Sequence, residues 1–341
     1  MDIKDIAKRA KVSTATVSRV INNVSTVDPK LVKKVRKVIG EMGYYPNSQA
    51  RALVSGRSNT FGLIVSEITN PFFPEIVQSF EDIAVEHNYE IMLTSTVHDP
   101  ARMELALRRM VERRVDGVAI MTFGTEETLL TDNPIFREMP LVFVDAGTPI
   151  RRHVSNLRID YLHGIRQAIE HLAELRHERI AFISGPPPVR SANARLEAYR
   201  QSMHEAGITV HEPLVVAGDH TIEGGMKAAA RLLALPRRSR PTAVLCSNDM
   251  TALGVMHECF ERGVNIPAEL SVVGYDDIRL ARYMLPPLTT VQMSQTLLAE
   301  MAFQALLRDV QNKDEAMMGS ESLLETKLIV RQSTAPAPSK L

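Results

Sequence analysis

Short apolar runs recur along the chain from residue 60 onward, separated by longer segments in which apolar residues return at every third or fourth position. The runs are FGLIV, YEIML, GVAIM, PLVFV, RIAFI, PLVVA, TAVLC and LSVVG. Runs that are apolar throughout are typical of strands buried on both faces of a parallel sheet, and the periodic segments are typical of amphipathic helices. The alternation predicts an α/β fold of doubly wound parallel sheets, and its length of about 270 residues favours two lobes.

The first 45 residues have a different pattern, in which three short helical stripes are separated by turns. The first predicted helix spans about Ile3 to Ala10 and follows Asp2, which can cap it. Ser13 is placed to cap a second helix, and Asp28 with Pro29 begins a third. Serine and aspartate are favoured caps, and proline is favoured at the first helical position.

The second of these helices has a small, polar outward face. Its inward residues are predicted to be Ala15, Val17, Val20 and Ile21. Thr14, Ser18 and Arg19 then face outward. Two helices joined by a short turn, with small polar side chains on the second, are typical of a helix-turn-helix domain, because such a helix can lie close to base edges in the DNA major groove. A plain three-helix bundle stays open as the alternative.

The charge distribution supports the DNA-binding interpretation. The chain has a formal net charge of zero, but residues 1–57 contain 12 Lys and Arg against 4 Asp and Glu, a net +8, which leaves −8 for the remainder. A basic segment on an acidic body is the electrostatic pattern of a protein that binds a polyanion. A solvated lysine-rich surface would give the same count, so charge alone does not decide.

Several functional classes are disfavoured by what the sequence does not contain. No apolar run is long enough to span a membrane, and the first residues show no apolar signal-peptide segment, so we expect a cytoplasmic protein. The sequence has neither phosphate-binding glycine motif, no zinc signature and no nucleophile elbow. Cys246 and Cys259 are expected to be free buried thiols. We therefore expect no cofactor, no metal, no catalytic residues and no enzyme activity.

A series of motifs makes the interpretation specific. DIAKRAKVSTATVSRVIN is followed in order by YYPNSQARALVSGRSNTFGLIV, NPFF, DGVAIM, SGPP, PTAVLCSNDMTALGVM, IPAELSVVGYDDI and PPLTTV. Together these motifs extend over residues 2–331, and their order and spacing make chance agreement implausible. In these motifs the chain closely resembles the lactose-repressor/galactose-repressor (LacI/GalR) family of transcription regulators.

The resemblance implies a division of the chain. The expected parts are a helix-turn-helix domain at 1–45, a hinge helix or linker at 46–59, an effector-binding and dimerisation core at 60–331 with the periplasmic-binding-protein fold, and a tail at 332–341. Within the core, the first lobe is expected at 60–159 and 289–320, and the second at 160–288 and 321–331. The tail has no heptads, so a homodimer is expected rather than a tetramer.

The resemblance also assigns DNA-binding residues. In the recognition helix they are Thr14, Ala15, Thr16, Ser18 and Arg19, and in the hinge segment they are Asn47, Ser48, Ala50, Arg51 and Leu53. By itself the hinge segment reads as a flexible linker, because so short a helix is marginal in water. In the family it orders on specific operator DNA, where Leu53 would be wedged into the minor groove.

The effector-binding residues implied by the resemblance are Phe72, Phe73, Asp145, Asp160, Arg195, His220, Asn248 and Asp276. An arginine and a carboxylate can bind neighbouring hydroxyls, which favours a sugar-like ligand. For the two adjacent phenylalanines, core packing stays open as the alternative. His220 stands where relatives often have an aromatic residue, which weakens a stacking floor and adds a hydrogen-bonding or pH-sensitive contact. Val189 stands where purine-binding relatives have an arginine, so a purine ligand is not carried over.

These observations predict a ligand-controlled transcription regulator, expected to be a repressor. It would bind double-stranded operator DNA as a homodimer, on a pseudo-palindromic site, with a small molecule between its two lobes. One alternative is a solute-binding protein of a transporter, which the basic head and the absent signal peptide disfavour. A sugar-handling enzyme is the other, which the absent phosphate loop and catalytic set disfavour.

Overall fold

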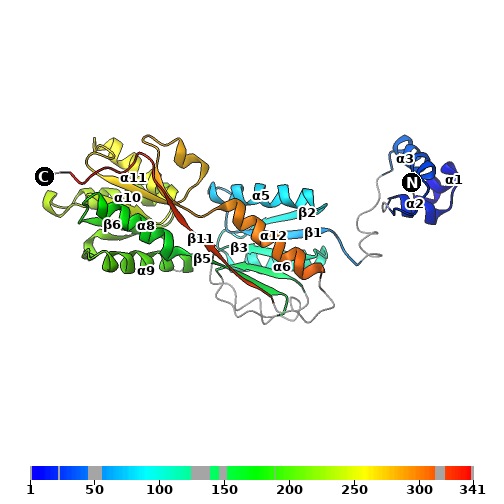
Figure 1. Ribbon diagram of the computed structural model, residues 1–341, viewed down its shortest axis with the longest axis horizontal. Helices are drawn as coiled ribbons and strands as arrows, with labels where there is room; N and C mark the ends of the chain where they lie inside the picture. The colour runs from blue at the N-terminus through cyan, green and yellow to red at the C-terminus, as the bar shows by residue number, and fades with distance from the viewer. Residues whose placement is uncertain are drawn as a thin grey trace. The chain divides into compact units, whose positions relative to one another are not determined.

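The computed structural model (Figure 1) describes residues 2–21, 24–44, 56–123, 139–145, 152–187, 189–311 and 319–338. The chain divides into two compact units, Met1–Ser58 and Asn59–Leu341. The residues assigned to the hinge helix, Asn47, Ser48, Ala50, Arg51 and Leu53, lie outside the described residues.

The first unit contains the three predicted helices. They are α1 (Ile3–Ala10), α2 (Thr14–Ile21) and α3 (Pro29–Met42). Asp2 and Asp5 form a capping box on α1, the Ser13 hydroxyl accepts a hydrogen bond from the Thr16 amide (3.1 Å) at α2, and Asp28 caps α3. These caps satisfy amide groups that the first turn of a helix leaves unpaired. Ala15 departs from the prediction, because it is exposed rather than packed inward.

The first lobe of the second unit is a six-stranded parallel sheet in the order β11-β5-β4-β3-β1-β2. Its strands are β1 (Thr60–Val65), β2 (Glu90–Ser95), β3 (Gly117–Met121), β4 (Leu141–Val144), β5 (Val154–Asp160) and β11 (Glu321–Glu325). Its helices are α5 (Phe72–Glu86), α6 (Pro100–Glu112) and α12 (Gln295–Gln311). The α5 and α12 side chains share one hydrophobic core, and those of α6 pack in another on the opposite face of the sheet.

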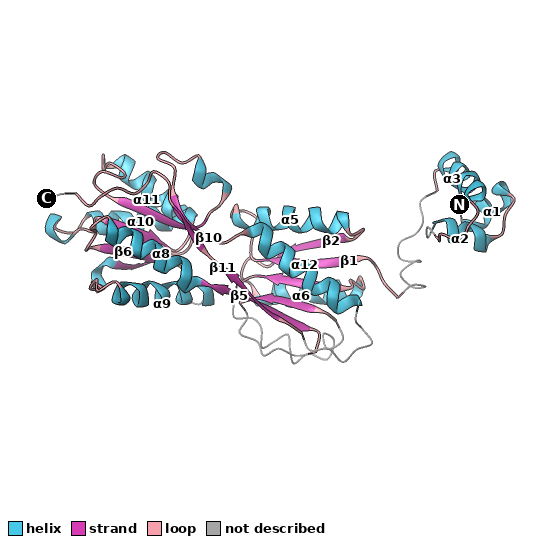
Figure 2. Ribbon diagram, in the orientation of Figure 1, coloured by secondary structure: helices cyan, strands magenta, loops and turns pink. Residues whose placement is uncertain are grey.

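The second lobe has a six-stranded sheet in the order β12-β10-β9-β8-β6-β7, parallel except for β12. Its strands are β6 (Ile180–Ser184), β7 (Val215–Ala217), β8 (Ala243–Cys246), β9 (Ser271–Asp276), β10 (Thr289–Gln292) and β12 (Lys327–Ile329). Its α-helices are α8 (Tyr161–Glu174), α9 (Arg190–Glu205), α10 (Ile222–Leu233) and α11 (Asp249–Glu261), and its 3₁₀ turns are η2 (Glu212–Leu214), η3 (Arg237–Ser239) and η4 (Arg279–Arg282). Figure 2 shows helices on both faces of the sheet, which confirms the predicted α/β fold with two lobes.

Two segments lie in the opposite lobe to the one expected. Residues 289–292 were expected in the first lobe, but β10 pairs with β9 in the second sheet. Residues 321–325 were expected in the second lobe, but β11 pairs with β5 in the first sheet, as Figure 1 shows. β11 pairs with a strand that is remote in the sequence, whereas β10 pairs with β9, the preceding strand along the chain, so the crossing to the first lobe follows β10 instead of preceding it. The chain passes between the sheets at Thr326, which is fully buried.

The expected tail is part of the second lobe as far as Ala337. The Ser333 hydroxyl accepts from the Thr289 amide (2.8 Å) and donates to the Val272 carbonyl (2.5 Å). The Ala337 amide donates to the Leu175 carbonyl (2.7 Å). The tail therefore contributes buried polar contacts to this lobe rather than extending freely.

Cys246 and Cys259 are free and buried, as expected. Within the described ranges no group of His, Cys, Asp and Glu has the arrangement of a metal site. The described helices include none that is both long and apolar enough to cross a membrane.

Candidate functional site

The outward face of α2 consists of short side chains and one arginine. Thr14, Ala15 and Arg19 are exposed, whereas Thr16 and Ser18 are half-buried. The Thr16 hydroxyl lies 2.9 Å from that of Ser13, so part of its hydrogen-bonding capacity belongs to the helix cap. A helix with this face can approach base edges closely, with Arg19 as its longest polar side chain.

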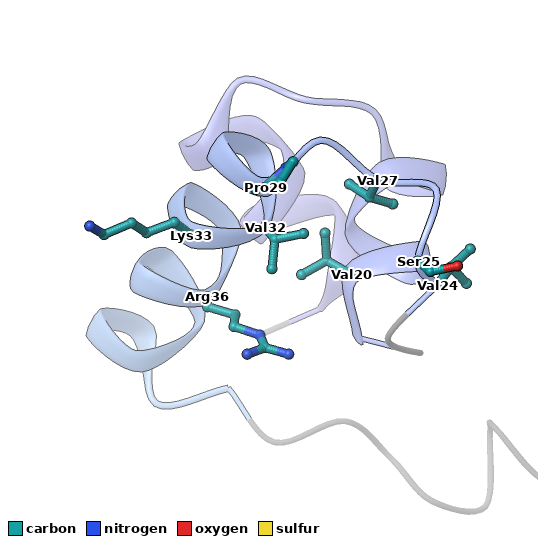
Figure 3. Close-up of a pocket in the computed structure, with 8 residues that line it drawn as sticks. All are labelled: Val20, Val24, Ser25, Val27, Pro29, Val32, Lys33 and Arg36. Carbon is teal, nitrogen blue, oxygen red and sulfur yellow. The ribbon is translucent and has the colours of Figure 1, made fainter.

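A shallow pocket of about 490 Å³ lies beside α3 in the same unit (Figure 3). Its lining residues are Val20, Val24, Ser25, Val27, Pro29, Val32, Lys33 and Arg36. Figure 3 shows Val20 and Val32 pointing toward one another, while the Lys33 ammonium points away from them. The lining is mostly aliphatic, so this pocket offers little chemistry for a polar small molecule.

Arg195 is the centre of a buried polar cluster in the second unit. Its side chain, on α9, is only 5% exposed, and its Nη2 lies 3.4 Å from Oδ1 of Asp276 at the end of β9. Its Nη1 donates a hydrogen bond to the Ser247 carbonyl. The guanidinium lies over the Tyr275 ring at 4.0 Å and near the Tyr161 ring at 5.3 Å. These contacts hold the planar cation in one orientation.

Two carboxyl groups flank this cation. Burial raises the pKa of Asp276 to about 7, and the attraction of Arg195 opposes that rise only in part. Burial also raises the pKa of Asp145, against the effects of the Tyr161 hydroxyl and the Ile159 amide. The Asp145 backbone, which follows β4, is in the left-handed region at φ 59°. Near neutral pH the cluster can therefore both donate and accept hydrogen bonds.

His220 and Asn248 are joined at the edge of the cluster. The Asn248 side chain caps α11 by accepting from the Thr251 amide (2.9 Å), and its Nδ2 donates to the His220 carbonyl (3.1 Å). Burial, with the neighbouring Arg195 charge, lowers the pKa of His220 to about 3. The imidazole is therefore neutral at physiological pH.

Several polar atoms of this cluster are buried without a hydrogen-bond partner among the described residues. They include Nε of Arg195, Nε2 of His220, Oγ of Ser247 and the hydroxyls of Tyr161 and Tyr275. Leaving a buried polar group unpaired costs about 1–3 kcal/mol, so several such atoms in one cluster point to a ligand. Ser247 was missed by the sequence reasoning. The signal available was its position directly after β8, because ligands bind at the carboxyl ends of parallel strands.

The remaining predicted effector residues have structural contacts. Phe72 and Phe73 are 3% and 7% exposed and pack edge to face at 5.4 Å, with Phe123 at 5.7 and 6.3 Å. They belong to the hydrophobic core of the first lobe. Asp160 caps α8 by accepting from the His163 amide (3.0 Å). The two phenylalanines therefore lie in the core, and the Asp160 carboxylate is used as a helix cap.

A polar pocket of about 400 Å³ adjoins the cluster. Its lining residues are Asp145, Asn156, Arg158, Ile159, Tyr161, Arg190, Ala194 and Glu321. Asp145 and Tyr161 belong to both the pocket and the surroundings of Arg195. The volume falls within the range of about 300–1,000 Å³ that is usual for small-molecule sites.

Comparisons with known proteins agree with both halves of this description. The model of the bacterial regulatory proteins of the lacI family matches residues 2–47, and that of a periplasmic binding protein-like domain matches residues 169–334. The HTH-type transcriptional repressor PurR of Proteus mirabilis (strain HI4320) is 34% identical over 336 residues, covering 98% of this chain and 97% of the relative. The ribose operon repressor of Escherichia coli (strain K12) is 34% identical over 308 residues, covering 90% and 92%.

A solved structure extends the likeness to the whole fold. The crystal structure of the Lac repressor dimer bound to operator and the anti-inducer ONPF matches with a TM-score of 0.86 and 28% identity, covering 98% of this chain and 99% of that one. The likeness extends over nearly the full length of the chain in both sequence and structure. The chain therefore belongs to the lacI family of bacterial regulatory proteins.

Proposed function

We propose that this protein is a ligand-controlled transcriptional repressor that binds operator DNA as a homodimer and has no enzyme activity of its own. The observation that carries the proposal is the combination, in one family member, of a basic helix-turn-helix unit and a two-lobed unit with unpartnered buried polar atoms. Since its target is operator DNA, we expect the protein in the cytoplasm.

The recognition surface is the outward face of α2. Thr14 and Ala15, both exposed, are proposed to lie against the bases, with Thr16, Ser18 and Arg19 contributing further base and phosphate contacts. The hinge residues Asn47, Ser48, Ala50, Arg51 and Leu53 are proposed to contact the minor groove at the operator centre. A two-fold dimer then requires a pseudo-palindromic operator with two half-sites.

The effector is proposed to be a sugar-like molecule bound between the lobes. Arg195, Asp276, Asp145 and Ser247 supply the donors and acceptors that hydroxyl groups need. The wider predicted set also includes Phe72, Phe73, Asp160, His220 and Asn248. A nucleobase ligand would need an open aromatic face to stack on, but Phe72 and Phe73 are packed in the core.

Contacts at the junction between the lobes link the ligand site to the first lobe. The Thr326 hydroxyl donates to the Asp160 carbonyl (2.6 Å), and the Gln295 side chain donates to the Asp276 carbonyl (3.0 Å). Asp276 is therefore bonded both to Arg195 in the site and to the start of α12, which packs on the first lobe. A ligand that changes the closure of the lobes would shift DNA affinity, with a typical coupling of about 1–3 kcal/mol.

The proposal is tested by DNA binding in the presence and absence of ligand. A mobility-shift titration with a selected operator fragment should show tight binding that weakens steeply with salt. Addition of the cognate sugar should change the affinity of the wild-type protein but not that of Arg195→Ala. A ligand response that survives in Arg195→Ala would show that the effector site is misassigned.

A further inference from the structure

Two consecutive aspartates at the end of β9 have strained backbones. Asp276 has φ 107° and Asp277 has φ 54°, both in the left-handed region that residues other than glycine adopt infrequently. Asp276 is the last residue of β9, and its carboxyl group lies beside Arg195 in the candidate effector site. Such strain persists only where the surrounding structure holds the backbone in place, and it occurs preferentially at sites that bind or switch.

The Asp277 carboxylate has protein partners on both of its oxygens. Arg331 Nη2 donates to Oδ1 (2.6 Å), and Gln292 Nε2 donates to Oδ2 (2.8 Å). The Asp277 side chain is only 2% exposed and that of Arg331 is 14% exposed, so these are buried, charge-assisted hydrogen bonds. We call these three side chains the clasp. Because both oxygens are paired within the protein, the role of Asp277 differs from the ligand contact assigned to Asp276.

Arg331 also binds the segment that begins β10. Its Nη1 donates to the Leu288 carbonyl (2.8 Å), and its backbone amide donates to the Thr289 hydroxyl (2.9 Å). One Nη atom thus binds the end of β9 and the other binds the residue before β10. The planar, two-pronged guanidinium is suited to this task, because it fixes two partners in one plane.

Both partners of Asp277 lie next to places where the chain crosses between the lobes. Gln292 is the last residue of β10, and α12 of the first lobe begins at Gln295. Arg331 follows β12, which is separated from β11 of the first lobe by one residue. The two crossings can be followed in Figure 1 at α12 and β11. The clasp therefore ties both of them to the residue after Asp276.

The neighbouring backbone groups of segment 276–279 are held by one side chain each. The pairs are Gln295 Nε2 with the Asp276 carbonyl (3.0 Å), the Ile278 amide with Asp249 Oδ2 (2.9 Å) and the Arg279 amide with Glu75 Oε1 (2.8 Å). Gln295 and Glu75 belong to α12 and α5, so this segment of the second lobe is bonded directly to the first lobe. A displacement of Asp276 can reach these bonds as long as Asp277 is fixed.

We propose that Asp277, clasped by Arg331 and Gln292, is a positioning residue that couples the effector site to the crossings between the lobes. With the clasp intact, a ligand that displaces the neighbouring Asp276 moves segment 276–279 as one body and biases the arrangement of the lobes. Without the clasp, the two strained residues absorb the displacement, and ligand binding no longer favours one arrangement. This inference rests on the proposed function, because it names the residues that carry the ligand response of the same protein.

Three variants separate coupling from plain stability. Arg331→Met removes both guanidinium hydrogen bonds, whereas Arg331→Lys keeps the positive charge but replaces the planar fork by a single ammonium group. Ser333→Ala is the matched control. It removes buried hydrogen bonds to Thr289 and Val272 from the same C-terminal segment and leaves the clasp intact. A purely structural role of Arg331 would make Arg331→Met and Ser333→Ala behave alike.

The assay is a mobility-shift titration of the selected operator with and without D-ribose, D-glucose or D-galactose, beside calorimetric titration of the same sugars. In the wild type and in Ser333→Ala, the sugar that binds should change the operator affinity at least about fivefold. Arg331→Met should bind that sugar with an affinity within about threefold of the wild-type value, yet its operator affinity should change less than about twofold. The response of Arg331→Lys should lie between these two.

The possible outcomes bear on different claims. A full response in Arg331→Met, or an equal loss of response in Ser333→Ala, overturns the role of the clasp and leaves the repressor in place. Loss of sugar binding in Arg331→Met overturns it as well, because the arginine would then support binding rather than coupling. If Arg331→Met does not fold, a full response in Arg331→Lys overturns the proposal. A wild type whose operator affinity responds to none of the three sugars contradicts the proposed sugar-controlled repressor and this inference with it.

Discussion

Replacing Asp276 by asparagine should remove a pH dependence of folding stability that this carboxyl gives to the protein. The side chain of Asp276 is buried, and Arg195 at 3.4 Å compensates its lost hydration only in part, so its pKa is raised to about 7. The unfolded chain has an aspartate pKa near about 3.9. Between these values the folded protein holds a proton on Asp276 that the unfolded chain has released.

The sign and size of the effect follow from that difference. The folded state binds more protons than the unfolded state between about pH 4 and pH 7, so the free energy of unfolding falls as pH rises through this window. At about 1.4 kcal/mol for each pKa unit, the full difference is about 4 kcal/mol, of which roughly 2–3 kcal/mol falls between pH 5 and pH 8. Asp276→Asn cannot ionise, so it should lack this fall.

The assay is urea denaturation at pH 5 and pH 8, followed by far-ultraviolet circular dichroism because the chain has no tryptophan. For each protein we take the change in unfolding free energy between the two pH values, and we compare this change in wild type and variant. The contributions of the other titrating groups are largely the same in both proteins and cancel in the comparison. Glu104→Gln, at an exposed carboxyl on α6, is the control and should behave as the wild type. Equal pH dependence in Asp276→Asn and the wild type would refute the reasoning from burial.

Four further outcomes follow from the same account. Leu53→Ala should weaken specific operator binding in a mobility-shift assay while effector affinity stays near normal, and unchanged operator affinity would remove the proposed minor-groove wedge. Arg195→Ala should lose the ligand response measured by operator binding yet keep basal DNA affinity, whereas the loss of a purely structural arginine would lower basal DNA affinity as well. Arg19→Ala should reduce the salt dependence of DNA binding by about one phosphate contact, and an unaltered slope would place Arg19 away from the backbone. Ser333→Ala should lower the unfolding free energy by about 1–3 kcal/mol in urea, because it leaves the buried Thr289 amide unpaired, and a neutral effect would contradict the observed packing of the C-terminal segment.

The eight apolar runs predicted as strands are all strands. Six of them are buried on both faces of a parallel sheet, whereas β2 and β7, at the edges of the two sheets, are only partly buried. The strands β5, β10, β11 and β12 were not among these runs, because they are short or interrupted by polar residues. Their polar side chains are satisfied by distant partners, as when the Thr290 hydroxyl donates to Asp249 (2.6 Å). Such pairing cannot be read from a local pattern, and the remote partner of β11 also explains why that strand was placed in the opposite lobe.

The candidate site likewise contains residues that the sequence could predict and contacts that it could not. The family resemblance assigns Arg195 and Asp276 to the effector site, and the structure brings the two together. The packing of Phe72 and Phe73 depends on Phe123, which follows a different strand, so the adjacent pair alone could not decide between core and cleft. Likewise, the His220 imidazole packs against Gly185, which lies in a loop that is separate from that of His220 in the sequence.

The central claim, that this family member is a DNA-binding regulator under ligand control, is tested most directly by in vitro selection of DNA from a random pool with the full-length protein. The account predicts enrichment of one pseudo-palindromic sequence with two half-sites, bound with an affinity that falls steeply with salt and changes when the cognate sugar is added. Enrichment of no sequence, or of a site whose affinity does not change with any sugar, would contradict it.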